Sequence, residues 1–229
     1  MIKKNCIICM ALVIGTTLAG QLGKNIFSDR GLCDITKIED LESYSFSLES
    51  VETKEDEEYY EDYADDYVDE FLESELILVG IPTGEYRMGT AAGMQEVKVE
   101  NVLKGNKELV GQQIWLDGMP GLSYYEDEDL LRMDAILNLM NEEHSYLIAC
   151  DAYGDIYLNE VPECSKYYEI ANCIFGYLDL TNRNNTGLIA DTKTLYTYND
   201  IKKFEFFGTS QNLLDKKQMI KNRIVREFF

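Results

Sequence analysis

The chain has 229 residues, of which 45% are hydrophobic, and its 16 Tyr and 9 Phe supply enough apolar area for one ordinary domain with appendages or two small domains. Its formal net charge is −21 at pH 7, from 42 acidic and 21 basic residues. Because such a surface repels phosphate backbones and anionic lipid head groups, we predict no nucleic-acid partner.

Residues 1–20 have the pattern of a secretory signal peptide or a membrane anchor. Lys3 and Lys4 precede the apolar run Cys6–Ile14, and the 19 residues that follow Lys4 carry no charge. This length suits both a cleaved signal peptide and a helix that spans a bilayer once. Residues 18–20, Leu-Ala-Gly, are similar to a lipoprotein lipobox, but Gln21 occupies the position of its acylated cysteine. We therefore expect an extracytoplasmic protein that is secreted or anchored to the cell membrane by a single N-terminal span.

Residues 21–58 are predicted to form an acidic, solvated linker, and an acidic helix is predicted to follow it. The stretch from residue 34 to residue 75 contains eighteen Asp or Glu. Aromatic side chains recur at three- and four-residue intervals, which places them on one face of a helix: Tyr60, Tyr63, Tyr67 and Phe71. This face is expected to dock on the following domain; alternatively, the acidic outer face binds cations or a basic partner. No calcium-loop motif occurs among these acids.

Residues 59–229 are predicted to form a mainly β (α+β) body. Short apolar runs, period-2 alternation and turn residues indicate strands over 76–80, 95–103, 113–117, 145–151 and 155–161. In the third of these strands, Ile114 and Leu116 are expected to point one way and Trp115 the other way. A helix or helical loop is predicted over 126–140, and a hairpin is predicted to join 174–180 to 187–196.

The chain is predicted to end in a basic amphipathic helix. Its apolar stripe is Leu213, Ile220, Ile224 and Phe228, and its basic residues are Lys216, Lys217, Lys221, Arg223 and Arg226. Such a helix can bind a membrane surface. In an acidic protein, we expect it instead to cap its own core and to face its own acidic surface.

The segments 76–80 (LILVG), 97–105 (VKVENVLKG) and 146–149 (YLIA), with the GQQI at 111–114, resemble a group of uncharacterised exported proteins of Gram-positive bacteria. The resemblance covers about residues 65–150. It implies a small OB-like β-barrel, akin to the netrin and metalloprotease-inhibitor fold. Barrels of this type bind oligonucleotides and oligosaccharides, although a shared fold is a weak argument for a shared function. The inhibitors of that fold use a cysteine at the mature N-terminus, and no matching cysteine begins the mature chain here, so inhibition is not implied.

The sequence contains no recognisable catalytic motif, and we predict no catalytic residue, no cofactor and no metal site. It has neither a phosphate-binding loop nor a nucleophile elbow. The one histidine, His144, is expected to lie in a solvated loop. The four cysteines beyond the leader could form up to two disulfides or remain free, and both possibilities stay open: Cys33, Cys150, Cys164 and Cys173.

A candidate ligand surface is predicted where aromatic and acidic residues come together: Trp115, Asp117, Tyr124 and Tyr125. From these patterns we expect a non-enzymatic binding or accessory module of the cell envelope, whose partner is an envelope protein or polymer. Two alternatives remain. One is a carboxylate-dependent hydrolase that uses acids of residues 118–128, and the other is an acidic cation-binding spacer. If the leader is not cleaved, it would also contact the membrane.

Overall fold

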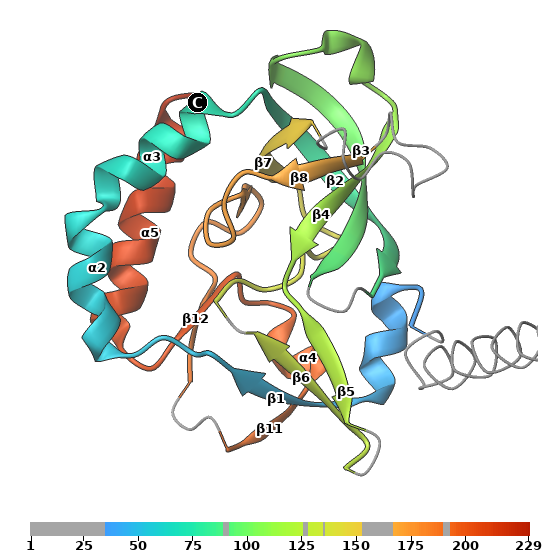
Figure 1. Ribbon diagram of the computed structural model, residues 1–229, viewed down its shortest axis with the longest axis vertical. Helices are drawn as coiled ribbons and strands as arrows, with labels where there is room; N and C mark the ends of the chain where they lie inside the picture. The colour runs from blue at the N-terminus through green and yellow to red at the C-terminus, as the bar shows by residue number, and fades with distance from the viewer. Residues whose placement is uncertain (1–34, 89–91, 126–127, 135, 153–166, 190–192) are drawn as a thin grey trace, which may run out of the picture. The chain divides into compact units, whose positions relative to one another are not determined.

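The structure is a computed structural model that describes residues 35–88, 92–125, 128–134, 136–152, 167–189 and 193–229 (Figure 1). The described chain from Ile35 to Phe229 forms one compact unit. The predicted leader, the predicted strand at 155–161, and two of the four cysteines beyond the leader, Cys33 and Cys164, lie outside the described residues.

Five strands form a closed β-barrel, which confirms the predicted mainly β fold. They are β2 (Leu76–Arg87), β3 (Gly93–Lys104), β4 (Gln113–Met119), β7 (Tyr146–Ala152) and β8 (Tyr167–Ile170). They pair in the order β2-β3-β4-β8-β7, and an additional pairing of β2 with β7 closes the cycle. Strands β4 and β8 run parallel, whereas the other four pairings are antiparallel. A short strand, β9 (Tyr177–Asp179), pairs antiparallel with residues 146–148 of β7, whereas β8 pairs with residues 150–152.

Strands β3 and β4 fill the barrel with alternate side chains. In β4, Ile114 and Leu116 are fully buried, while Trp115 between them is half-buried. In β3, Val97 and Val99 are fully buried and Lys98 is exposed. This two-residue period is what the sequence predicted, because successive side chains of a strand point to opposite faces.

A second, four-stranded sheet has the order β11-β1-β6-β5. Its strands are β1 (Ser45–Glu49), β5 (Leu122–Tyr125), β6 (Leu130–Asp134) and β11 (Leu195–Thr197). A parallel pair of short strands, β10 (Thr186–Leu188) and β12 (Phe206–Gly208), lies apart from both sheets.

The α-helices are α2 (Glu57–Asp62), α3 (Ala64–Glu73), α4 (Tyr198–Ile201) and α5 (Gln211–Arg226). The described residues also form three 3-10 helices, η2 (Ile38–Ser43), η3 (Lys54–Asp56) and η4 (Lys107–Leu109). Helices α2 and α3 both contact α5 and run alongside it (Figure 1). No helix of the described chain is sufficiently long and apolar to cross a membrane.

The aromatic stripe of the acidic helix docks as predicted, with one exception. Tyr60, Tyr67 and Phe71 are buried, but Tyr63 is 44% exposed. The helix is interrupted at Tyr63, whose backbone φ of −107° lies outside the helical range, and Ala64 takes the buried position instead. The structure therefore corrects the predicted stripe at this residue.

The predicted linker is wrong from Ile35 onward, because this part of the chain belongs to the fold. Strand β1 lies in the interior of the second sheet, between β6 and β11, and its side chains Phe46 and Leu48 are buried. Apolar residues alternate over Ser45–Glu49, which is a strand pattern. The many acidic residues around it led us to predict a linker instead.

The predicted helix over 126–140 is also wrong in its described part, which contains strand β6. Leu130 and Leu131 pair with β1 and β5, so neighbouring strands override the local helical spacing. The predicted hairpin of 174–180 with 187–196 does not form either. Strands β9, β10 and β11 pair with β7, β12 and β1 respectively.

Helix α5 caps the core as expected, and two of its lysines are themselves buried. Lys217 pairs with Glu52, and Lys221 pairs with Glu205. At the exposed side of the helix, Lys216 pairs with Glu61 and Arg223 pairs with Asp65. Basic residues of α5 thus face the acidic segment at residues 52–65.

Candidate functional site

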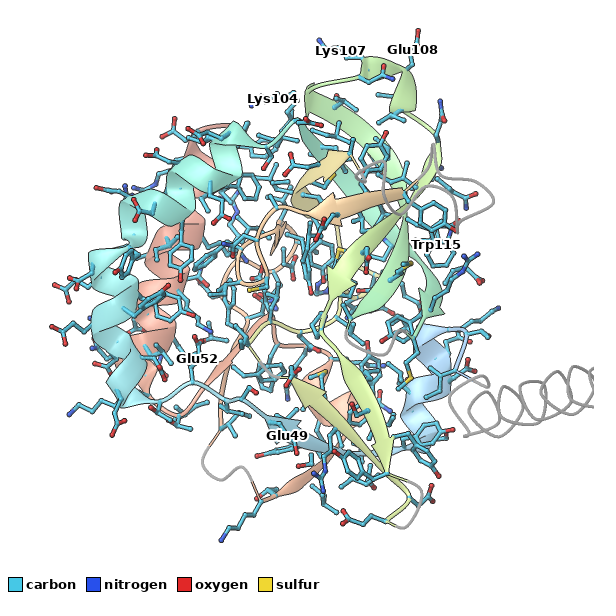
Figure 2. The ribbon with its side chains drawn as sticks, viewed as in Figure 1. Glu49, Glu52, Lys104, Lys107, Glu108 and Trp115 are labelled. Atoms are coloured by element: carbon cyan, nitrogen blue, oxygen red, sulfur yellow. The ribbon has the colours of Figure 1, made fainter. Side chains whose placement is uncertain are left out.

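The outer face of the barrel carries a cluster made of Trp115, which Figure 2 labels, and two residues that contact it, Arg87 and Tyr167. The Arg87 guanidinium carbon lies 4.1 Å from the centroid of the Trp115 ring, a cation–π distance. The Tyr167 ring is nearly parallel to the Trp115 ring, at 16° and 6.4 Å between centroids. Arg87 Nη1 donates a hydrogen bond to Tyr167 Oη at 2.7 Å. We call these three residues the Trp115 cluster.

Strand register explains why three residues far apart in sequence meet. Trp115 on β4 is the direct partner of Tyr167 on β8, and paired residues share a face of the sheet. Arg87 is the last residue of β2, two strands away from β4, and its long side chain reaches across β3. The cluster therefore depends on barrel closure in this strand order.

Carboxylates lie beside the cluster on the same face. Asp117 is the register partner of Glu169, one alternation after the Trp115–Tyr167 pair. Asp117 Oδ1 accepts a hydrogen bond from the backbone N–H of Gly118 at 2.7 Å. The face thus combines a half-buried indole with guanidinium donors and carboxylate acceptors.

Tyr124 and Tyr125, predicted on the same surface, lie instead on β5 of the second sheet. The Tyr124 ring meets Tyr44 edge-on at 5.8 Å, and its hydroxyl donates to Asp129 Oδ1 at 2.8 Å. The Tyr125 ring lies 3.7 Å from the guanidinium carbon of Arg132. The structure groups Trp115 with Asp117, but it places the two tyrosines in a different sheet.

Sequence reasoning did not find Arg87 and Tyr167. Tyr167 pairs with Trp115 itself, and Arg87 pairs with β3, the strand next to β4. No spacing rule in the sequence links either residue to Trp115. The available signal was the outward position of Trp115, because a large aromatic side chain on the outer face of a sheet packs against cross-strand neighbours.

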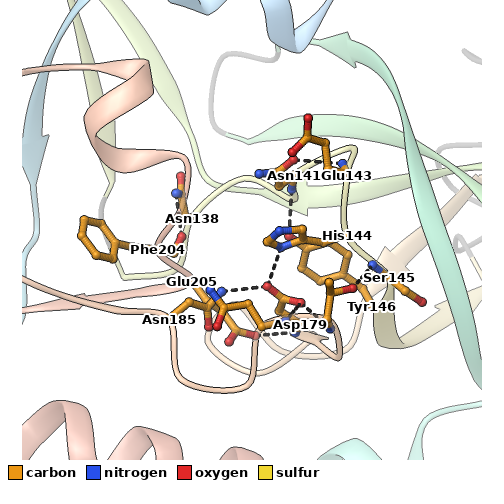
Figure 3. A network of polar contacts seen from close by, with 12 residues as sticks. Asn138, Asn141, Glu143, His144, Ser145, Tyr146, Asp179, Asn185, Phe204 and Glu205 are labelled. Carbon is orange, nitrogen blue, oxygen red and sulfur yellow. Dashed lines mark hydrogen bonds and ion pairs between the residues drawn. The ribbon is translucent and has the colours of Figure 1, made fainter.

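A buried polar network surrounds the histidine and is shown in Figure 3. His144 Nδ1 lies 2.7 Å from Asp179 Oδ2, and the Asp179 side chain is fully buried. Asp179 also accepts hydrogen bonds from Asn185 Nδ2 at 2.7 Å and from the Thr181 N–H at 2.8 Å. His144 lies in a loop as predicted, before β7, but its side chain is only 18% exposed and contacts Asp179, so the predicted solvation of the histidine is corrected.

Glu205 links this network to helix α5. Its Oε1 accepts a hydrogen bond from the Asp179 N–H at 2.6 Å, and its Oε2 pairs with Lys221. Burial raises the pKa of Glu205 to about 7, against the opposing charge of Lys221. The described contacts of the His144 ring are with Asp179 and with the ring of Tyr146 at 6.5 Å, and neither supplies a nucleophile. The network therefore has the residues of a structural link, which joins β9, the residue before β12 and helix α5.

An acid-lined groove of about 440 Å³ lies beside α3. Its carboxylates are Asp66, Asp69, Glu70, Glu73 and Asp151. Within the ranges that the structure describes, however, no group of three or more His, Cys, Asp or Glu is arranged to hold a metal ion. Cys150 and Cys173 are free thiols, the former buried and the latter exposed.

No protein-family model, no curated protein and no solved structure matches this chain.

Proposed function

We propose that the chain is a non-enzymatic, extracytoplasmic binding module of the cell envelope, and that it binds an envelope polymer through the outer face of its barrel. The single observation that carries this proposal is the Trp115 cluster on β4, where Arg87 and Tyr167 hold the indole on a polar face. Three further arguments support it: the strand order of the barrel, the net charge of the protein and the N-terminal leader.

The strand order favours an OB-like barrel. Counted along the chain, the barrel strands β2, β3, β4, β7 and β8 are the first to the fifth, and their spatial order is 1-2-3-5-4 with closure on the first. In an OB-fold, the face of strands 2 and 3 and the adjacent loops receive oligonucleotides or oligosaccharides. The corresponding strands here are β3 and β4, and β4 carries Trp115 and Asp117. This agrees with the resemblance to exported Gram-positive proteins.

Charge favours a glycan over a nucleic acid as the ligand. A net charge of −21 opposes the approach of a phosphate backbone, whereas a neutral sugar ring meets no such barrier. Carboxylates accept hydrogen bonds from hydroxyl groups, and guanidinium N–H groups donate to sugar oxygens. An envelope polysaccharide such as peptidoglycan is therefore the ligand class that this face suits.

Location follows from the N-terminal segment. Lys3 and Lys4, before an apolar run, are typical of a segment that directs a chain across a membrane. In this proposal the module works outside the cytoplasm, either released or held at the membrane by that segment. Many acidic side chains then keep it soluble in the envelope.

Sedimentation with insoluble peptidoglycan tests the proposal on the full chain. We expect Trp115→Ala to weaken binding by about 30-fold, the effect of losing an interface hot spot of about 2 kcal/mol. The matched control is Tyr125→Ala, an aromatic truncation at a 39% exposed position of the second sheet, which we expect to leave binding unchanged.

Two outcomes would overturn this proposal. One is equal binding of wild type and Trp115→Ala with both proteins folded by circular dichroism. The other is the release of soluble glycan fragments that stops on Asp117→Asn, which would instead establish a carboxylate-dependent hydrolase.

A further inference from the structure

A cavity lies where one end of the barrel passes into the second sheet. None of its described lining residues belongs to the Trp115 cluster. Its volume is about 370 Å³. The apolar walls come from four parts of the chain: Ala92 before β3, Met119 at the end of β4, Pro120 after it, Ile136 and Leu137 after β6, and Cys173 between β8 and β9. This volume lies within the range of about 300 to 1,000 Å³ typical of small-molecule sites.

Several small residues line the cavity, and the fold requires one of them to be glycine. Gly118 has a φ of +93°, and a Cβ atom there would lie 2.6 Å from Cγ1 of Ile170. Side chains are therefore excluded at Gly118 both by backbone conformation and by contact. Ala92 and Gly121 complete the group of small lining residues. Met119 and Leu137, by contrast, are each 1% exposed and belong to the core, so the apolar wall is fixed.

The polar lining includes Ser50 and Asp134, and Asp134 is the one charged residue among the described lining residues. Asp134 lies exposed at the rim, and its Oδ1 accepts a hydrogen bond from Ser50 Oγ at 3.1 Å. Ser50 adopts a φ of 54°, a left-handed conformation that non-glycine residues rarely take. Among the described lining residues none is basic. Lys217 donates to the Ile136 carbonyl oxygen behind the wall, but Glu52 pairs with its charge.

From this combination we infer that the cavity binds a small apolar amine. Its ammonium group lies at Asp134, and its alkyl or aryl part packs against Met119, Ile136 and Leu137. A carboxylate of the same size would meet Asp134 as a like charge, in a protein that already carries a net charge of −21. Because this lining shares no residue with the Trp115 cluster, the inference goes beyond the proposed function and does not depend on it.

Protection of Cys173 provides the test, because this thiol lines the cavity. The full chain is treated with a methanethiosulfonate reagent, and labelling of the Cys173 peptide is followed by mass spectrometry with hexylamine or hexanoate present. At a hexylamine concentration about ten times its Kd, we expect the labelling rate at Cys173 to fall about tenfold. Hexanoate at the same concentration is expected to lower the rate by only about twofold, because it meets the exposed Asp134 as a like charge.

Variants separate a bound ligand from a general effect on the protein. Ala92→Leu fills the cavity, and we expect it to abolish protection, whereas Ala152→Leu, at the exposed end of β7, retains it. Asp134→Asn is expected to weaken hexylamine binding by about threefold, since an exposed charge contributes modestly. Equal protection by hexanoate overturns the inference. So does protection that persists in Ala92→Leu, or its absence in the folded wild type.

Discussion

At the scale of single residues, the least expected feature is the charge buried beneath α5. Asp179 and Glu205 are two buried carboxylates joined through a backbone N–H, and the buried cation that pairs with Glu205 is Lys221. Placing a charge in an apolar interior is costly unless it is paired and hydrogen-bonded. The network in Figure 3 meets this condition for Asp179 through three neighbouring donors. For Glu205, burial outweighs the pairing with Lys221 and the hydrogen bond from the Asp179 N–H, so its pKa rises to about 7.

This raised pKa makes stability depend on pH in a defined direction. Between the ordinary glutamate pKa of 4.5 and about 7, folded Glu205 keeps a proton that the unfolded chain releases. Stability from this residue is therefore present at low pH and is lost as pH rises through that window, by up to about 3 kcal/mol. We expect Glu205→Gln to gain stability relative to wild type by that amount over the same window, as measured by urea denaturation at a series of pH values.

The matched control for this change is Glu100→Gln, at an exposed position of β3. Its stability relative to wild type should stay within about 0.5 kcal/mol at every pH. If Glu205→Gln and wild type give parallel pH profiles, Glu205 does not titrate in this window and the argument for its raised pKa fails.

At the scale of elements, β1 shows that the acidic segment is part of the fold. Phe46 is fully buried and packs against Tyr198, with 6.0 Å between ring centroids. We expect Phe46→Ala to lower the free energy of unfolding by about 3 to 5 kcal/mol, the cost of a large core cavity. Leu195→Ala, at a 59% exposed position of β11 in the same sheet, should change it by less than about 0.5 kcal/mol. Urea denaturation of the full chain measures both, and a solvated linker would give no loss for Phe46→Ala.

Strands with a clear hydrophobic pattern could be predicted from the sequence, but the strands with which they pair could not. Strands β3 and β4 follow from alternation of apolar residues, and β2 and β7 follow from short apolar runs. The prediction of these four strands is confirmed. The predicted helix over 126–140 failed because β6 is held by two neighbouring strands, which no local pattern encodes.

The candidate site could likewise be predicted only where it depends on a single strand. The outward position of Trp115 is a property of one strand and was predicted, whereas Arg87 and Tyr167 come from strands whose register only the closed barrel sets. Lys217 and Lys221 were predicted beside the apolar stripe of α5. Their burial depends on acidic partners 165 and 16 residues earlier in the chain, Glu52 and Glu205, which no helical period reveals.

At the scale of the whole molecule, excess negative charge opposes folding, and salt should relieve it. Screening grows as the Debye length falls from about 30 Å at 0.01 M salt to about 3 Å at 1 M. Salt also weakens exposed ion pairs such as Lys216–Glu61 and Lys202–Glu42, but each contributes only about 0 to 1 kcal/mol. Against a net charge of −21, repulsion is the larger effect. We therefore expect the thermal midpoint at pH 7 to rise with NaCl over this range.

The same titration near the isoelectric point separates charge screening from other effects of salt. At a pH near the sequence pI of about 4.3 the net charge is close to zero, so added NaCl has little repulsion to screen. The rise in thermal midpoint should then disappear, while a general salting-out effect would persist at both pH values. A midpoint that falls with NaCl at pH 7 would mean that ion pairs between α5 and the acidic helices contribute more than their exposure indicates. In that case the acidic residues of α2 and α3 would stabilise the fold through their ion pairs with α5. Their mutual repulsion would then be the smaller effect.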